Sequence, residues 1–233
     1  MLAGCSFSTS VTNEVMIDGA DPVDAAIDAV PDVALLPVCN VGVTTMPGAD
    51  RGHVGSDTGG GVNFGPLRCT AATDRIIGFG IRTSNGNTLF NARSAHGLTI
   101  ACAPVTVDPN TGTGTFGTMY VVEVKGSGAE GWTPSTLVAP TLCPAGMVVN
   151  GLRAYTGPGQ NLFTNLDFRC GQLDGTTAMT IANPVVHVAN SLTETQNPDT
   201  VNCGTNEILV ELPNRTGSGF DSVDLFCAPA KCL

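Results

Sequence analysis

The sequence has little charge, few aromatic residues and no long apolar run. Charged residues make up 13% of the 233, and 20 acidic side chains against 10 basic ones leave a net charge of −10. Nucleic acid is not an expected partner, because phosphate recognition needs a basic surface. No segment approaches the roughly 20 consecutive apolar residues that span a bilayer, so membrane attachment is expected only through a lipid anchor.

Histidine and the common catalytic motifs are also scarce. The three histidines, His53, His96 and His187, show no HxxxH or HxH spacing, and the chain has no CxxC motif. A zinc site is therefore not expected, and no cofactor is assigned. The sequence contains neither GxSxG nor SxxK, so we assign no catalytic residue. A hydrolase whose site residues meet only in space remains one hypothesis.

Two glycine motifs resemble enzyme signatures but lack the flanking elements that those enzymes need. Gly112, Gly114 and Gly117 satisfy GxGxxG, but β-rich sequence follows where a dinucleotide site needs a helix, so a hairpin loop is predicted. Asp57 begins the Asp-Thr-Gly triplet of aspartic proteases. No apolar strand leads into this triplet, and a loop is predicted there as well.

Glycine, proline and aliphatic residues dominate what is present. The chain has 29 glycines and 15 prolines, and 42% of its residues are hydrophobic although only 5% are aromatic. This composition is typical of many short strands joined by tight turns, with a core of valine, leucine, isoleucine and alanine.

Six of the nine cysteines form a repeat. Three pairs each enclose an apolar run, a glycine-rich turn and an alternating strand that ends in cysteine. The three endings are LTIAC (98–102), LDFRC (166–170) and VDLFC (223–227). Alternation with period two is typical of a strand with one buried face, so each pair of cysteines encloses a β-hairpin.

A hairpin brings its two ends together, and this predicts disulfides within each repeat. The fourth pair would join the first strand of the domain to the last. Each hairpin disulfide is expected to contribute about 3–4 kcal/mol by restricting the unfolded chain. The predicted pairs are Cys69–Cys102, Cys143–Cys170, Cys203–Cys227 and Cys39–Cys232.

The repeat also predicts the domain organisation. Further strand candidates at 33–43, 118–126 and 178–190 separate the hairpins. Residues 33–233 are therefore expected to form one all-β domain of three repeats, at about 33–102, 103–170 and 171–233. Residues 1–32 are acidic and punctuated by alanine and proline, which indicates a flexible linker.

The N-terminus resembles a bacterial lipoprotein. Leu2, Ala3, Gly4 and Cys5 are similar to a lipobox, whose cysteine is acylated in that family, but no basic and apolar leader precedes them. The resemblance implies lipidation at Cys5. Together with the cysteine count it places the protein in the cell envelope or outside the cell, lipid-anchored or secreted.

The three-repeat pattern, with the ending GSGFDSVDLFC, resembles the β-prism of vitelline membrane outer layer protein I and the jacalin-type lectins. The resemblance implies three antiparallel sheets about a pseudo-threefold axis; a β-sandwich is the alternative fold. It also implies glycan binding by loops at one end of the prism. The candidate ligand residues are Asn214, Gly217, Gly219, Phe220 and Asp221, with Trp132 and Tyr155 as stacking partners.

The sequence thus favours a non-catalytic protein that recognises a surface or matrix glycan. A structural subunit of an extracellular coat or appendage, with self-association as its function, is the second hypothesis. The hydrolase with a spatially assembled site is the third.

Overall fold

The computed structural model describes ten segments of the chain, and these contain strands and no helix. All described residues lie in one compact unit, Leu35–Leu233. The expected linker at 1–32 lies outside them, and so does Cys5. The described segments are 35–55, 62–84, 94–125, 136–137, 139–156, 163–175, 178–181, 186–188, 198–216 and 220–233.

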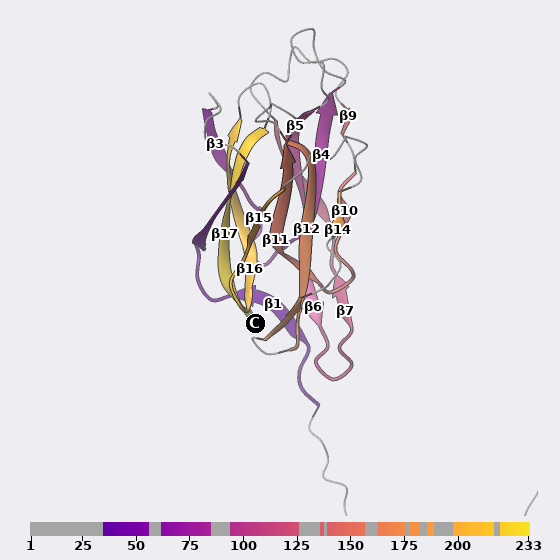
Figure 1. Ribbon diagram of the computed structural model, residues 1–233. Coiled ribbons are helices and arrows are strands. Elements are labelled where there is room, and N and C mark those ends of the chain that lie inside the picture. The colour runs from indigo at the N-terminus through magenta and orange to yellow at the C-terminus, as the bar shows by residue number, and fades with distance from the viewer. Residues whose placement is uncertain are drawn as a thin grey trace, which may run out of the picture. The chain divides into compact units, whose positions relative to one another are not determined.

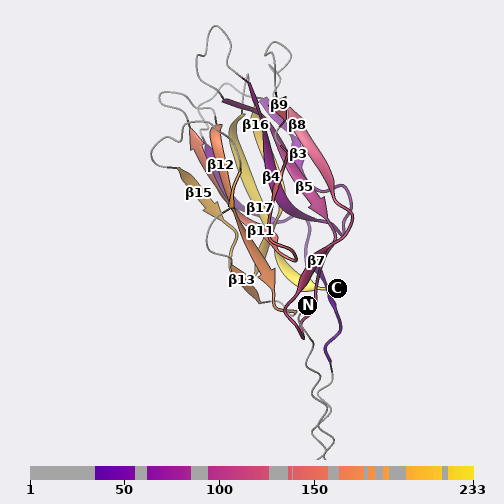
Figure 2. The same ribbon diagram turned by 90° about the vertical axis from the view of Figure 1, so that its right-hand side faces the viewer.

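Three long antiparallel hairpins form the centre of the unit, one in each of three sheets (Figures 1 and 2). The first hairpin pairs β4 (Arg75–Ser84) with β5 (Ser94–Ala103), and the second pairs β11 (Val148–Thr156) with β12 (Phe163–Leu173). The third pairs β16 (Glu207–Thr216) with β17 (Phe220–Cys232). These are the three hairpins that the cysteine repeat predicts.

Short strands extend each hairpin on both sides. In the first sheet β8 pairs with β5, and β9 and β10 pair with β4; in the second, β13 and β14 pair with β12, and β15 pairs with β11. The bounds are β8 Tyr120–Lys125, β9 Thr136–Leu137, β10 Thr141–Leu142, β13 Met179–Ile181, β14 Val186–His187 and β15 Asp199–Asn202.

The third sheet combines strands from both ends of the described chain. β2 (Ala49–Gly55) pairs with β17, and β3 (Val62–Leu67) pairs with β16. β1 (Cys39–Val43) also pairs with β17 and continues this sheet through β6 (Val105–Val107) to β7 (Gly114–Phe116). The predicted repeats, 33–102, 103–170 and 171–233, assign these strands to different repeats. The structure places them in one sheet.

The three hairpins share one register. Cys102, Cys170 and Cys227 stand opposite Ile76, Val149 and Leu209, and in each hairpin a β-bulge follows immediately. We call this cysteine end of the hairpins the base and the turning end the tip. Three antiparallel sheets of five to seven strands with equivalent hairpins are the β-prism that the sequence predicts, and the β-sandwich alternative is wrong.

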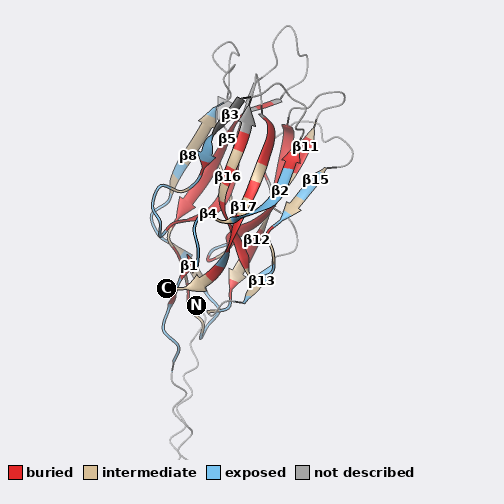
Figure 3. Ribbon diagram, turned by 90° about the vertical axis from the view of Figure 1, so that its left-hand side faces the viewer, coloured by how far each residue is buried: buried red, intermediate tan, exposed pale blue. Residues whose placement is uncertain are grey.

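The hairpins bury a common core of mainly aliphatic side chains. Figure 3 shows buried residues concentrated on the hairpin strands and exposed residues on outer strands such as β2 and β15. All three sheets contribute to the main cluster, for example with Ile100, Phe168 and Leu225. Phe79 and Phe168 meet across the core with ring centroids 5.5 Å apart. A second cluster, which includes Val41, lies at the base.

All four predicted disulfides are present. The three hairpin disulfides have Cα–Cα distances of 5.7, 5.7 and 5.6 Å, and the terminal pair Cys39–Cys232 has 4.9 Å. In each hairpin the disulfide joins a cysteine that precedes the first strand to a cysteine on the second strand. The second cysteine pairs with a residue near the start of the first strand. The fourth disulfide adds a covalent link to the pairing of β1 with β17, which joins the two ends of the unit.

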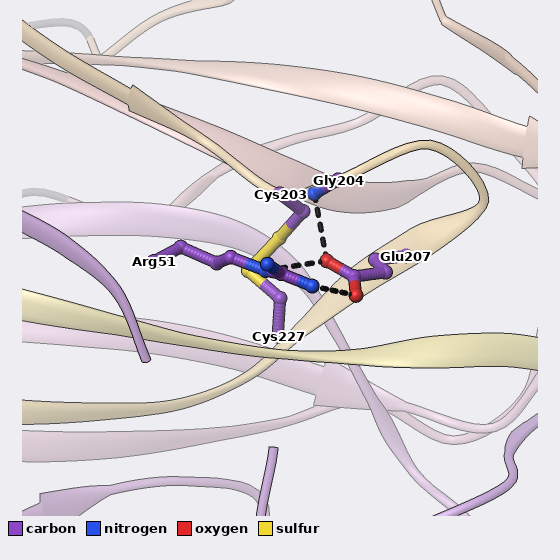
Figure 4. A network of polar contacts seen from close by, with 5 residues as sticks. All are labelled: Arg51, Cys203, Gly204, Glu207 and Cys227. Atoms are coloured by element: carbon purple, nitrogen blue, oxygen red, sulfur yellow. Dashed lines mark hydrogen bonds and ion pairs between the residues drawn. A yellow bond between two sulfur atoms is a disulfide. The ribbon is translucent and has the colours of Figure 1, made fainter. Parts of the chain in front are cut away.

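An arginine clamp covers the base of the third hairpin (Figure 4). Arg51 on β2 binds both carboxylate oxygens of Glu207, with Nε 2.8 Å from Oε2. Glu207 also accepts a hydrogen bond from the Gly204 amide at 2.7 Å, beside the Cys203–Cys227 disulfide. The hydrogen bonds and charge of Glu207 raise the pKa of Arg51 above its usual value. The clamp therefore joins β2 to β16.

A buried arginine joins the first hairpin to β1. The Arg75 side chain donates to the backbone carbonyls of Val41, Ala72 and Asp74, at 2.9, 3.0 and 2.6 Å. Its burial lowers the pKa of Arg75, partly offset by the charge of Asp74. The carbonyl bonds satisfy a cation that would otherwise be costly to bury.

Candidate functional site

The tip of the third hairpin carries the candidate site, and its geometry follows from a feature common to all three hairpins. One or two pairs before each turn the register shifts, between Arg82 and Thr83, Tyr155 and Thr156, and Arg215 and Thr216. Each shift leaves one extra residue on the returning strand. These extra residues are His96, Thr164 and Asp221, which therefore occupy equivalent positions.

Asp221 is the only carboxylate among these three equivalent residues. It follows the turn at Gly217 and Gly219, whose structure lies outside the described residues, and its own side chain is 5% exposed. A bulge re-aims the side chain that it carries, and bulges are frequent beside binding sites. The third hairpin thus places a largely buried carboxylate next to a glycine-rich turn.

Gly55 brings β2 close to this position. A Cβ atom on Gly55 would collide with the carbonyl oxygen of Asp221 and with the Phe163 ring, and the residue has φ of 98°. Its amide donates to Asp199 Oδ2 on β15 at 3.2 Å. Glycine is needed here both for its backbone conformation and for the close approach. Asp199 and Gly55 are 144 residues apart in the chain, and no local sequence signal could have joined them.

Asn214 lies beneath the tip. It is 2% exposed, and its Nδ2 donates to the carbonyls of Gly65 and Leu212, both at 3.3 Å. Its Oδ1 is buried without a hydrogen-bond partner in the described structure. The register places Asn214 where the other hairpins have Ile81 and Ala154, which belong to the core. Asn214 can therefore position the hairpin but does not reach the surface.

Tyr155 is placed differently from a stacking residue. Its side chain is 8% exposed, and its hydroxyl donates to Asp167 Oδ2 at 2.7 Å. Its carbonyl accepts from Thr164 Oγ1 at 3.1 Å. The ring is thus held inside the protein at the tip of the second hairpin. An exposed aromatic face, which stacking on a sugar needs, is not available at this position.

The remaining candidates fall partly outside the described residues. Trp132, Gly217 and Gly219 lie outside them entirely, as does the Asp57 triplet. Phe220 begins β17 and pairs with Thr216, but its side chain is not described. The structure therefore brings Asn214 and Asp221 together in one hairpin and places Tyr155 in another.

The predicted glycine-rich loop after Asp108 is a hairpin turn at the base. The Asp108 amide donates to the Thr113 carbonyl and the Gly112 amide donates to the Asp108 carbonyl, and Gly112 has φ of 68°. Asn110 binds the entering chain, because its side chain accepts from the Leu36 amide at 2.9 Å and donates to the Leu36 carbonyl at 2.7 Å. The dinucleotide alternative for this motif has no helix to support it, since β7 and β8 follow the turn.

The described residues contain no cluster of three or more histidine, cysteine or acidic side chains able to hold a metal ion. Within the same residues, no helix is long and apolar enough to cross a membrane. The described site is thus made of carboxylate, amide and backbone groups.

Comparisons with known proteins find similar folds only. No family model matches the sequence, and no curated protein matches it. The Calystegia sepium agglutinin structure matches with TM-score 0.47 and 13% identity, over 80% of this chain and 99% of that one. Malaysian banana lectin matches with TM-score 0.43 and 12% identity, over 78% and 99%.

A third match is a mannose-binding jacalin-related lectin from Ananas comosus, with TM-score 0.40 and 14% identity, over 78% of this chain and 97% of that one. Three antiparallel sheets with equivalent hairpins are the arrangement that the sequence resemblance to jacalin-type lectins implies. In its fold, the protein resembles the jacalin-related lectins.

Proposed function

We propose that the protein is a non-catalytic glycan-binding protein that acts outside the cytosol, with the tip of its third hairpin as the recognition site. The observation that supports this most is the position of Asp221. It is the only carboxylate among the residues at the three equivalent bulges, and it follows a turn that contains two glycines.

A held carboxylate suits sugar recognition, because sugar hydroxyls donate hydrogen bonds to it in a fixed direction. The packing of Gly55 against the Asp221 backbone and the buried amide of Asn214 fix the third hairpin before any ligand binds. Preorganisation of this kind reduces the entropy lost on binding. In this proposal the backbone amides of Gly217 and Gly219 donate hydrogen bonds to the sugar. Phe220 and Trp132 make apolar contacts to the sugar ring.

The proposed location follows from the cysteines. Four disulfides in one unit persist in an oxidising compartment and are rare in the cytosol. Because the start of the chain resembles a lipobox, we also propose a lipid anchor at Cys5. In that arrangement the hairpin tips, which lie at the opposite end of the unit from β1 and the C-terminus, would face away from the membrane (Figure 1).

A glycan array with the purified protein tests this function. We expect binding to a subset of glycans, and a loss of about tenfold or more in affinity for Asp221→Ala, since hydrogen bonds to a charged group are worth about 1.5–3 kcal/mol. Thr164→Ala is the matched control, because Thr164 occupies the equivalent bulge of the second hairpin. Equal binding by wild type and Asp221→Ala, with the same melting temperature, would overturn the assignment.

One observation supports a structural subunit as the second candidate function. β8 is an edge strand of the first sheet, and Met119 and Val121 at this edge are 47% and 44% exposed. Exposed apolar edge strands pair readily with other chains. Light scattering over a concentration series would detect ordered oligomers, and Val121→Lys should abolish them. A monomer at all concentrations would exclude this candidate.

A further inference from the structure

Two rows of polar side chains lie on the outer face of the second sheet, away from the third hairpin. In one row of this face, Thr200, Arg153 and Asp167 stand side by side on β15, β11 and β12. In the next row, Asn202, Gly151 and Arg169 do the same. These strands lie next to one another in Figure 1.

Gly151 stands opposite Arg169 and two residues before Arg153. A Cβ atom there would collide with Asn202 Oδ1, so the Asn202 amide lies over the glycine. The neighbouring Arg153 and Arg169 are half-buried, and Thr200 and Asn202 are exposed. Together with Leu152 and Phe168, these four side chains pack around Gly151 without space for a water molecule. Asn202 thus fills the place of the missing side chain, and the outer surface above the two guanidinium groups is where a ligand would bind.

The two arginines differ from the other arginines whose side chains are described. Arg51, Arg68 and Arg82 each form an ion pair with a glutamate, and Arg75 donates to backbone carbonyls. Neither Arg153 nor Arg169 forms an ion pair with a carboxylate of the described residues.

Asp167 is the acidic group nearest to them in the register. It stands opposite Arg153, but its carboxylate accepts the hydroxyl hydrogen bond of Tyr155 at 2.7 Å and is 6% exposed. Arg153 is oriented from the other side, since its Nε donates to Thr200 Oγ1 at 3.2 Å. This bond leaves the terminal nitrogens of Arg153 available to a ligand.

The chemistry of this arginine pair fits an oxyanion. Two guanidinium groups at diagonal positions of neighbouring strands are about 7–8 Å apart at the backbone, within reach of one ligand group. Arginine is the side chain best suited to bind a carboxylate, through paired hydrogen bonds. The protein carries a net charge of −10, which repels densely charged polymers. A single carboxylate on an otherwise neutral ligand avoids most of that repulsion.

The hydroxyl of Thr200 and the amide of Asn202 add donors and acceptors beside the arginine pair. These groups match the hydroxyls that flank the carboxylate of an acidic sugar. We propose that the pair of Arg153 and Arg169 is a second binding site, which takes the carboxylate of a uronic-acid-type sugar on the outer surface of the second sheet. This site shares no residue with the third hairpin, so it stands independently of the proposed function.

Titration with D-glucuronate tests the proposal, with the arginine Nε–Hε signals followed by NMR at low salt. We expect saturable shifts of the Arg153 and Arg169 signals, and at least a threefold weaker affinity for acetate. D-glucose should cause no shift. Arg153→Gln and Arg169→Gln should each weaken glucuronate binding by about fivefold or more. Arg68→Gln is the matched control, because it also removes a surface arginine but one that is already paired with Glu211.

Three results would overturn the proposal. Equal shifts with glucose and glucuronate would show that the carboxylate is not recognised. Equal affinity for acetate would show that the sugar hydroxyls contribute nothing. Glucuronate binding that is unchanged in both arginine variants would place the ligand elsewhere. Melting temperatures of the variants within a few degrees of wild type exclude unfolding as a cause.

Discussion

The base and the tip of the prism belong to the same three hairpins but are built differently. At the base the hairpins agree: each has a disulfided cysteine at the same register position and the same bulge after it. At the tip they share a bulge but differ in the residue it carries, which is His96, Thr164 or Asp221.

This difference separates the contacts that stabilise the base from the proposed recognition site at the tip. Disulfides, the Arg51–Glu207 clamp and the Asn110 contact hold the base together. Beneath the tip of the third hairpin, Asn214 has a buried amide oxygen without a described partner, in a position where the other hairpins have apolar residues; Asn150 at the base of the second hairpin has one as well. Binding sites commonly contain groups that do not favour stability, and other parts of the protein compensate for them.

Removal of disulfides should have the largest effect on the base. The chain-entropy model predicts a loss of about 5 kcal/mol for Cys39→Ala with Cys232→Ala, whose disulfide spans 193 residues. For Cys203→Ala with Cys227→Ala, whose disulfide spans 24 residues, it predicts about 3 kcal/mol. Urea unfolding of both double variants measures the difference. A larger loss for the shorter loop would contradict the view that the long disulfide closes the unit.

A glycine contact tests the close packing of the base. Gly114 on β7 and Gly146 before β11 touch so closely that a Cβ atom on either would collide with the backbone of the other. Gly114→Ala should therefore cost about 1–3 kcal/mol of unfolding free energy. Gly65→Ala on β3 is the control, because its Cβ would meet no atom within 4 Å. Equal stability of the two variants in urea would show that the base is loosely packed.

Asn214→Leu should weaken binding at the tip while it changes stability little. The substitution places an apolar side chain where the other hairpins have Ile81 and Ala154, so the unfolding free energy should stay within about 1 kcal/mol of wild type. Glycan binding should nevertheless weaken, because the hydrogen bonds to Gly65 and Leu212 that position the hairpin are lost. Calorimetric melting and the glycan array measure the two effects. A strongly destabilised variant with normal binding would reverse the comparison.

The smallest expected effect concerns pH and the turn at the base. Hydrogen bonds from the Asn110 backbone amide, and from further groups of Asn110 and Thr111, lower the pKa of Asp108. A lowered folded-state pKa stabilises the protein above the usual aspartate pKa, and this contribution is lost as pH falls through the lowered value. Wild type should thus exceed Asp108→Asn in urea midpoint at neutral pH and lose that advantage in acid. A difference that does not change with pH would contradict this role.

The sequence predicts the hairpins well because each carries its own local signals. Alternation before Cys102, Cys170 and Cys227 identifies the returning strands, and glycine-rich turns identify the tips. The disulfide pairs follow, since a hairpin brings its ends together. β8 and β14 lie within the predicted strand regions for the same reason of local apolar pattern.

The remaining strands and the assembled sites depend on contacts that are distant in sequence. β2 has one buried residue, Val54, in an otherwise exposed pattern, so its sequence gives no alternation to recognise. The approach of Gly55 to Asp221 and Asp199 depends on the pairing of β2 with β17 from the two ends of the unit. The arginine pair on the second sheet likewise becomes visible only once β11, β12 and β15 are aligned in register. The burial of Tyr155 depends on its bond to Asp167, which sequence alone does not reveal.

The most direct test of the account is the disulfide connectivity of the folded protein, because both proposed sites depend on three hairpins held in the same register. A peptide map under non-reducing conditions should recover Cys69–Cys102, Cys143–Cys170, Cys203–Cys227 and Cys39–Cys232. Bonds between different hairpins, or free thiols among these eight cysteines, would contradict it.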